Sequence, residues 1–247
     1  MKSTRLPGKA LLKIKGKPVI EHLIDRLKLA KRPDLIALCT STHPDDAILV
    51  DVARNNGIEY FRGSEDDKLD RYLNAAQKYG VDFIVVTEGD NVFYEPEIID
   101  KIIELYLSTN ADYISCLDLP VGTAPHGVKA EALQKVCKIK GEQDTEVWPG
   151  YFTDTGLFKV ELVEVEEKLR RPEIRLTLDY PEDYKLFEEI FNRLYQAGKV
   201  FSLRDILSLL EDNPQLTDIN RNVEAVYLEH LKKSAPVKLK DSLTTDS

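Results

Sequence analysis

The stretch DFIVVTEGD, residues 82–90, decides the fold prediction. Asp82 to Thr87 is almost continuously apolar and is β-branched at its centre, which is typical of a strand buried on both faces of a parallel sheet. Glu88-Gly89-Asp90 follow at once, so two carboxylates stand where this strand ends. In open α/β sheets, ligands bind beyond the carboxyl ends of the strands. The stretch therefore predicts a central strand that leads into a binding site.

Strands and helices alternate on either side of this stretch. Short apolar runs predict further strands, and stretches of helical period predict the helices between them. The alternation predicts an α/β fold with a mainly parallel central sheet flanked by helices. We expect the strands at 35–40, 58–61, 113–117 and 174–178, and the helices at 19–27, 47–53, 69–76, 96–106 and 181–194, with two more between 202 and 231.

The chain is expected to form one domain with additions, because no long Gly/Ser-rich or Pro-rich linker interrupts it. The domain covers residues 1–200. Its regular pattern weakens at about 118–160, an irregular insert whose loop-like composition is typical of functional segments. A C-terminal helical extension covers 201–233, and the polar residues 234–247 are expected to form a flexible tail.

Composition limits the functional classes. The 247 residues include 43 acidic and 34 basic side chains, a net charge of -9, which argues against general nucleic-acid binding. Three widely spaced cysteines suggest neither a disulfide framework nor a thiolate metal site, and fit a reducing, cytoplasmic setting. The apolar runs are far shorter than the ~20 residues that span a bilayer, so no membrane insertion is expected.

The segment STRLPGK, residues 3–9, is a candidate phosphate-binding loop. Ser3 supplies a hydroxyl, Gly8 allows close approach of backbone N–H groups, and Arg5 and Lys9 supply positive charge. The alternative interpretation is a solvated basic N-terminus, since such short motifs recur by chance.

Asp90 and Asp179 are the candidate metal ligands. Each follows a predicted strand, and Mg²⁺ is commonly held by one or two carboxylates together with water and phosphate oxygens. The alternative for Asp90 is a simple Gly-Asp-Asn turn. Glu182 and Asp183, just after Pro181, are better explained as acids that cap the first turn of a helix.

Taken together, the ordered motifs resemble those of the cytidylyltransferases that make CMP-activated sugar acids. That family includes CMP-3-deoxy-manno-octulosonate synthetase and CMP-sialic acid synthetase, and the branch most similar to this chain is related to spore-coat polysaccharide biosynthesis. The resemblance covers nearly the whole chain and is weakest between 116 and 173. It is carried by STRLPGK (3–9), KGKPVIEHLIDRL (15–27), FRGSEDDKLDRY (61–72), EGD (88–90), RLTLDYPEDY (175–184) and NPQLTDINRNVE (213–224).

The resemblance implies a Rossmann-like nucleotidyltransferase fold, commonly a homodimer, that transfers CMP from CTP to a sugar acid and releases pyrophosphate. Arg5 and Lys9 match phosphate-loop positions, and Lys9 joins Asp90 and Asp179 as expected catalytic residues. The two aspartates match positions that bind Mg²⁺. The segment from Arg62 through Ser64 to Asp67 matches the loop near cytosine and ribose.

The acceptor is expected to bind in the irregular insert. A sugar acid carries a carboxylate and several hydroxyls, which call for cations and hydrogen-bonding side chains. His126, Lys129 and Tyr151 are the candidates, with Trp148 and Thr153 nearby. The alternatives are that His126 shapes a turn and that the aromatic side chains only pack.

Members of the family usually begin with a strand that ends in an Arg, directly before the residues that match 1–4. We therefore expect the natural protein to extend upstream of Met1, with that strand in the middle of the sheet. Without it, neighbouring strands keep unpaired backbone groups, at ~1–3 kcal/mol for each buried group. Reduced or absent activity is expected for a chain that starts at Met1.

Two other functions fit the same residues. The first is a metal-dependent glycosyltransferase, since such enzymes have two paired acids after a strand and Glu88-Gly89-Asp90 has the same spacing. A nucleotidyltransferase that uses another nucleotide belongs to the same alternative. The second is an inactive paralogue that only binds a nucleotide or a partner. Pyrophosphate release distinguishes nucleotidyl transfer from sugar transfer and from binding alone.

Overall fold

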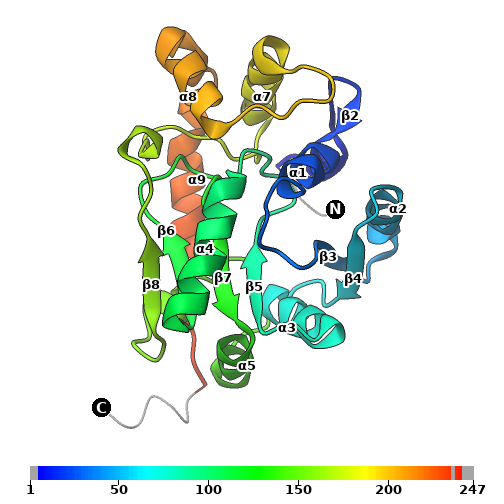
Figure 1. Cartoon of the computed structure of the whole chain (residues 1–247), viewed down its shortest axis with the longest axis vertical. Helices are drawn as coiled ribbons and strands as arrows, with labels where there is room; N and C mark the ends of the chain where they lie inside the picture. The colour runs from blue at the N-terminus through cyan, green and yellow to red at the C-terminus, as the bar shows by residue number, and fades with distance from the viewer. Residues whose placement is uncertain (1–4, 235–236, 241–247) are drawn as a thin grey trace.

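Two groups of strands form the β-structure in the computed structural model, which describes residues 5–234 and 237–240 (Figure 1). One is a parallel pair, β3 (Ala37–Ser41) and β4 (Glu59–Gly63). The other is a four-stranded sheet in the order β5 (Phe83–Val86), β7 (His126–Lys129), β6 (Tyr113–Cys116), β8 (Val160–Val163). A short antiparallel pair, β1 (Lys13–Ile14) and β2 (Lys17–Pro18), lies near the N-terminus.

The four-stranded sheet is mixed rather than mainly parallel, because two of its three strand pairings are antiparallel. β7 is antiparallel to both β5 and β6, and β6 is parallel to β8, so β7 alone runs against the other three. The sequence pattern did not predict β7 because it has only four residues with Gly127 among them. That glycine has a packing reason: a Cβ there would lie 2.4 Å from the Phe83 ring and 2.6 Å from Ile102.

Helices cover both sides of these strands (Figure 1). All the helices expected from the sequence pattern are present, and α5 and α6, both in the insert, were not expected. They are α1 (Val19–Leu27), α2 (Ala47–Asn55), α3 (Lys68–Tyr79), α4 (Pro96–Thr109), α5 (Ala130–Ile139), α6 (Gly150–Thr153), α7 (Pro181–Leu194), α8 (Leu203–Asp212) and α9 (Arg221–Ser234). Short 3₁₀ turns are η1 (Lys9–Leu11), η2 (Pro44–Asp46), η3 (Glu167–Leu169) and η4 (Pro214–Ile219).

Two apolar clusters hold the elements together. The larger one joins α1, α4, α7 and α8, so the C-terminal extension packs on the same core as the N-terminal helix. The smaller one lies under the insert around Tyr113, Trp148 and Phe152. Each fully buried large apolar side chain contributes ~1.5–3 kcal/mol relative to an exposed one. The larger cluster includes Val92, Phe93 and Tyr94, which fixes the chain directly after Asp90.

An apolar groove separates β3 from β5. Residues 36–39 line one side of it and residues 83–87 the other, around a cavity of about 540 Å³. Within the described ranges, β3 pairs only with β4 and β5 only with β7, so the two strand edges face each other unpaired. This is the middle of the β-structure, where the family resemblance led us to expect one more strand.

The strand expected at 174–178 is not formed. This segment is extended, but it makes only a bridge between Val121 and Arg175, with Val121 N donating to Ile174 O at 2.9 Å and Leu176 N to Val121 O at 2.8 Å. The neighbouring chain turns away at Gly122, whose backbone φ is 91°, so the pairing stops after one residue. Asp179 therefore follows an extended segment rather than a regular strand.

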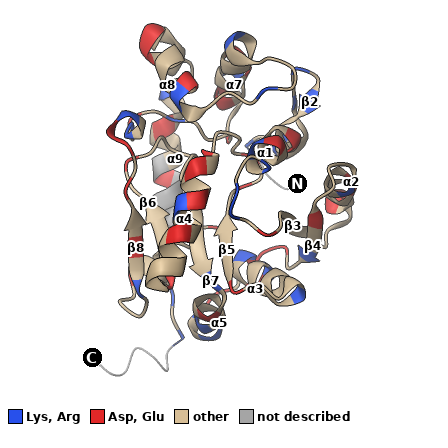
Figure 2. Cartoon of the chain, viewed as in Figure 1, with Lys and Arg blue, Asp and Glu red and all other residues tan. Residues whose placement is uncertain are grey.

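The part of the expected tail that the structure describes, residues 237–240, packs against the insert. Leu239 bridges to Lys140, and Gly141 N donates to Lys238 O at 2.7 Å. The other tail residues from 235 onward lie outside the described residues. Among the described helices, none has the length and apolar character that crossing a bilayer requires. Figure 2 shows that acidic and basic residues are interspersed along the helices.

Candidate active site

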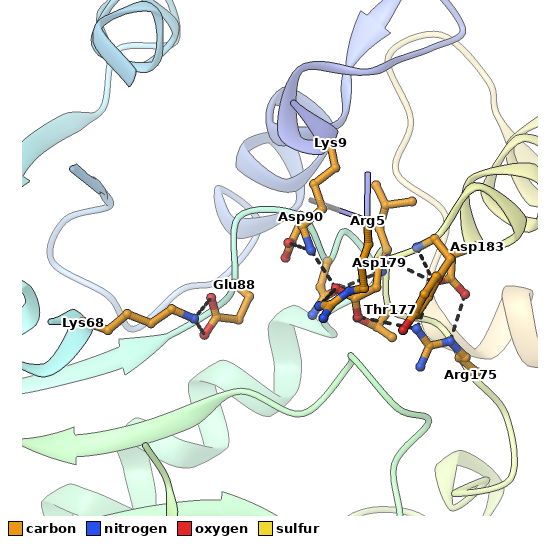
Figure 3. Close-up of polar contacts among 12 residues, drawn as sticks. Arg5, Lys9, Lys68, Glu88, Asp90, Arg175, Thr177, Asp179 and Asp183 are labelled. Atoms are coloured by element: carbon orange, nitrogen blue, oxygen red, sulfur yellow. Dashed lines mark hydrogen bonds and ion pairs between the residues drawn. The ribbon is translucent and has the colours of Figure 1, made fainter. Parts of the chain in front are cut away.

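Four charged side chains from distant parts of the sequence meet beyond the carboxyl end of β5 (Figure 3). The Lys9 ammonium contacts both Asp90 and Asp179, and its Nζ lies 2.7 Å from Asp179 Oδ1. Arg5 Nη2 lies 3.3 Å from the same Asp179 oxygen. The structure thus brings together the two expected cations of the N-terminal loop and the two expected metal ligands.

The N-terminal loop is held in place by a left-handed glycine. Gly8 has φ 65° and ψ 20° and stands directly before η1, where its carbonyl accepts a hydrogen bond from Leu11 N at 2.8 Å. A side chain at this position would be strained, because L-residues other than Gly rarely adopt that conformation. The turn aims Lys9 at the aspartates. The remaining predicted residue of this loop, Ser3, lies outside the described residues.

Asp179 is fixed from several directions. Its Oδ2 accepts from Thr177 Oγ1 at 3.2 Å and lies 3.5 Å from Arg175 Nη2. Its backbone N–H donates to Asp183 Oδ2 at 2.9 Å. Asp183 is fully buried and also binds Arg175 Nε and Nη2, each at 2.9 Å. The expected helix-capping role of Asp183 is confirmed, because its carboxylate also accepts from the backbone N–H of Tyr180, the residue before α7, at 3.0 Å. The same carboxylate orders the segment that carries Asp179.

The two aspartates have different electrostatic surroundings. Burial raises the pKa of Asp90 above its ordinary value. The Lys9 charge lowers this pKa, but the nearby Glu88 and Asp179 charges raise it again. Burial also acts on Asp179, but Lys9, Arg5 and Arg175 outweigh it and hold its pKa below the ordinary value. Neighbouring titratable groups with diverging pKa values are typical of active sites.

Asp90 and Asp179 fit a hard divalent cation. Because a single ammonium group touches both carboxylates, one ion at that place would be within reach of both. Two carboxylates with open positions for water and phosphate oxygens suit Mg²⁺. No group of three or more potential ligands from His, Cys, Asp and Glu occurs among the described residues. The site therefore suits an ion that a bound phosphate helps to hold.

The expected cytosine and ribose loop follows β4. Arg62 donates to the carbonyls of Ser41 and His43 at 3.0 and 2.8 Å, which joins the carboxyl ends of β3 and β4. Ser64 Oγ accepts from Asp67 N at 3.1 Å, and Ser64 O accepts from Arg71 Nη1 at 2.6 Å. The loop is thus ordered by backbone contacts before any ligand binds.

One of the three predicted acceptor residues lies near the end of β5. His126 pairs with Val86, and its Nδ1 is 2.7 Å from Tyr113 Oη. Burial lowers the pKa of His126 to about 4, so the ring is neutral at pH 7. The site can therefore use it as a neutral hydrogen-bonding group.

The other two predicted acceptor residues lie elsewhere. Lys129 pairs with Phe83 at the opposite end of β5, about 10 Å further along the strand than His126, and binds Glu131 at 2.8 Å. Tyr151 is 3% exposed and packs in the insert cluster, with its hydroxyl donating to Lys238 O at 3.4 Å. The structure does not bring these two residues to the carboxylates at the end of β5, because antiparallel β7 carries Lys129 away and Tyr151 packs in the insert core. Their roles in acceptor binding stay predictions.

Two charged residues of the site, Lys68 and Arg175, were not predicted from the sequence. Lys68 Nζ lies 3.3 Å from each carboxylate oxygen of Glu88, on the other side of Asp90 from Lys9 (Figure 3). Arg175 supports Asp179, as described above. The sequence does contain an indication for Lys68, because a cation at the first residue of a helix interacts unfavourably with the helix dipole and is therefore unusual there.

Relatives with solved structures share this architecture. A cytidylyltransferase from Leptospira borgpetersenii superposes with a TM-score of 0.80 at 26% identity, covering 88% of this chain and 92% of that one. A CMP:2-keto-3-deoxy-manno-octonic acid synthetase solved with CTP superposes with a TM-score of 0.61 at 14% identity, covering 78% and 95%. These neighbours confirm the Rossmann-like nucleotidyltransferase fold.

Sequence relatives extend over most of the chain. An uncharacterized protein of Methanocaldococcus jannaschii is 38% identical, covering 90% of this chain and 91% of its own length. The spore coat polysaccharide biosynthesis protein SpsF of Bacillus subtilis is 30% identical, covering 87% and 92%. The family model described as "Cytidylyltransferase" matches residues 1–206. The chain is therefore a nucleotidyltransferase enzyme that belongs to the cytidylyltransferase family.

Proposed function

We propose that this enzyme transfers CMP from CTP to a sugar acid and releases pyrophosphate, in the synthesis of a cell-surface or other polysaccharide. The observation that carries the proposal is the Lys9 ammonium, which touches Asp90 and Asp179 beside Arg5. A loop that carries two cationic side chains and faces two carboxylates can bind a nucleoside triphosphate together with a divalent ion. The names of SpsF and of the 3-deoxy-manno-octulosonate cytidylyltransferases among the relatives support this substrate class.

Positioning and charge neutralisation account for the proposed reaction. Arg5 and Lys9 face the place of the leaving pyrophosphate, where their charge stabilises developing negative charge. Asp90 and Asp179 would hold Mg²⁺, which when bound polarises the α-phosphate and screens its charge. Release of Lys9 from the two carboxylates then leaves its ammonium free for phosphate oxygens. Arg175 and Thr177 keep Asp179 in its orientation throughout.

Pyrophosphate release tests the proposal. The purified chain is assayed with CTP, Mg²⁺ and a panel of 2-keto sugar acids that includes 3-deoxy-manno-octulosonate, and with ATP, GTP and UTP in parallel. We expect turnover with CTP and one acid, in this chain or in a form extended at its N-terminus, and loss of at least a hundredfold in Asp179→Asn. Asp51→Asn, which removes an exposed carboxylate on α2, is the matched control. Turnover with a nucleotide other than CTP, or with none, would contradict the proposal.

A homodimer is part of this proposal. Its support is β8, which forms the outer edge of the described sheet and leaves Val160 37% and Leu162 49% exposed. Unpaired edges with apolar side chains are sites for association. Sedimentation equilibrium at micromolar concentration measures the mass, and a purely monomeric protein would exclude this arrangement.

A further inference from the structure

Lys68 and Glu88 form an ion pair at the rim of the active site. Lys68 is the first residue of α3 and Glu88 follows β5, so the pair links two separate elements. The Lys68 Nζ lies 3.3 Å from both carboxylate oxygens. The side chains are 22% and 36% exposed, which leaves both charged groups accessible from the site.

Fold stability does not explain this pair. A cation in the first turn of a helix opposes the helix dipole. Partly exposed ion pairs with long contacts contribute little to stability. Asp67, directly before Lys68, already caps the helix by accepting from Asp70 N at 3.0 Å. Local features that conflict with helix physics are expected at functional sites rather than in the scaffold.

The position of the pair points to one substrate. In displacement at phosphorus, the attacking and leaving oxygens lie roughly in line on opposite sides of the phosphorus atom. Arg5 and Lys9 stand on one side of Asp90, where the proposed pyrophosphate lies. Figure 3 shows Lys68 and Glu88 on the other side of Asp90, toward which the attacking acceptor must be held. His126, which pairs with Val86 two residues before Glu88, lies near the same end of β5.

We propose that Lys68 and Glu88 are the acceptor-recognition pair, in which the Lys68 ammonium binds the carboxylate of the acceptor and Glu88 accepts hydrogen bonds from its hydroxyls. The inference rests on the proposed function and deepens it. In the ligand-free site, Glu88 holds the ammonium in place. The acceptor carboxylate replaces part of that contact, and the released Glu88 oxygen meets a neighbouring hydroxyl, so each charge keeps a partner.

Steady-state kinetics of Lys68→Met, Lys68→Arg and Glu88→Gln test the assignment. The probe is the sugar acid that the wild-type enzyme turns over best, compared with its neutral methyl ester. For Lys68→Met we expect the KM for the acid to rise tenfold to a hundredfold, with the KM for CTP within twofold of wild type. The preference for acid over ester should fall by the same factor, and Lys68→Arg should restore most of it.

Controls separate recognition from general damage. Lys101→Met removes an exposed lysine on α4 and should leave every constant unchanged. Glu88→Gln should raise the KM for the acid about tenfold while largely keeping the acid-over-ester preference. An unchanged acid KM and an unchanged acid-over-ester ratio in Lys68→Met would overturn the inference while leaving the proposed function standing. If the wild-type enzyme turns over no acid with CTP, the proposed function fails first and the inference falls with it.

Discussion

Replacing Asp183 by Asn should destabilise the protein strongly, although Asp183 contacts no substrate in the proposed mechanism. Its carboxylate is fully buried and accepts five hydrogen bonds: two from Arg175 at 2.9 Å, one from Asn220 Nδ2 at 2.9 Å, and two from the backbone N–H groups of Asp179 and Tyr180 at 2.9 and 3.0 Å. Asn keeps the shape, but it removes the charge and turns an NH₂ group toward these donors. Of its two carboxylate partners, Arg175 would then keep Asp179, 3.5 Å away.

The magnitude follows from breaking a buried ion pair. Removing one partner of such a pair costs about 3–5 kcal/mol, because the other charge stays buried without compensation. At about 2–4 °C per kcal/mol for a domain of this size, the unfolding midpoint should fall by roughly 6–20 °C. Urea unfolding and a thermal melt measure the change. Glu182→Gln removes the same charge one residue earlier and should cost about 0.3–1 kcal/mol. An Asp183→Asn protein within 1 kcal/mol of wild type would refute the reasoning.

Three further predictions concern single side chains. Asp90→Asn should lower pyrophosphate release at least a hundredfold and leave the unfolding midpoint equal or higher, because burial disfavours this carboxylate in the folded state; a large drop in the midpoint would contradict this. The pKa of His126 is about 4 in the folded protein and near 6.5 in the unfolded chain, so the free energy of unfolding should fall by at most about 3 kcal/mol as the pH decreases between these values. Urea titrations should show a smaller pH-dependent loss in His126→Gln. The same pH profile in His126→Gln and wild type would contradict this prediction. Lys140→Met leaves the buried Asp67 carboxylate without its ion pair and should cost about 3 kcal/mol by urea unfolding, whereas a cost below 1 kcal/mol would show that Thr145 Oγ1, 3.1 Å away, is partner enough.

The sequence predicted the elements whose residues carry their own signal. β5 is continuously apolar, and α3 ends at Gly80 with φ 63°, so both could be located from local pattern. β7 could not be located in this way, because its sequence HGVK is short and its glycine is required by Phe83, which is distant in sequence. A local sequence pattern indicates only the secondary structure that its own residues favour. The insert instead depends on contacts with strands that are distant in sequence, so its elements could not be located in this way.

The same distinction holds for the site. Asp90 and Asp179 were predicted because each stands where an extended segment ends, and that position survives even though 174–178 is not a strand. Lys129 was misplaced because the direction of β7 could not be read from its sequence. The Lys68–Glu88 pair was missed because its two residues are 20 positions apart and meet only when α3 lies against the end of β5.

The groove between β3 and β5 leads us to predict that the two groups of strands open separately. β3 and β4 form a two-stranded unit, which is marginal in water without packing partners, and α2 and α3 supply these partners. Since no described sheet hydrogen bond joins this unit to β5, it can open locally while the four-stranded sheet stays closed. Arg62 and Ser64 belong to the first part and Asp90 to the second. A nucleotide that touches both would therefore act as a clamp between them, and slower amide exchange in β3 and β4 would report its binding.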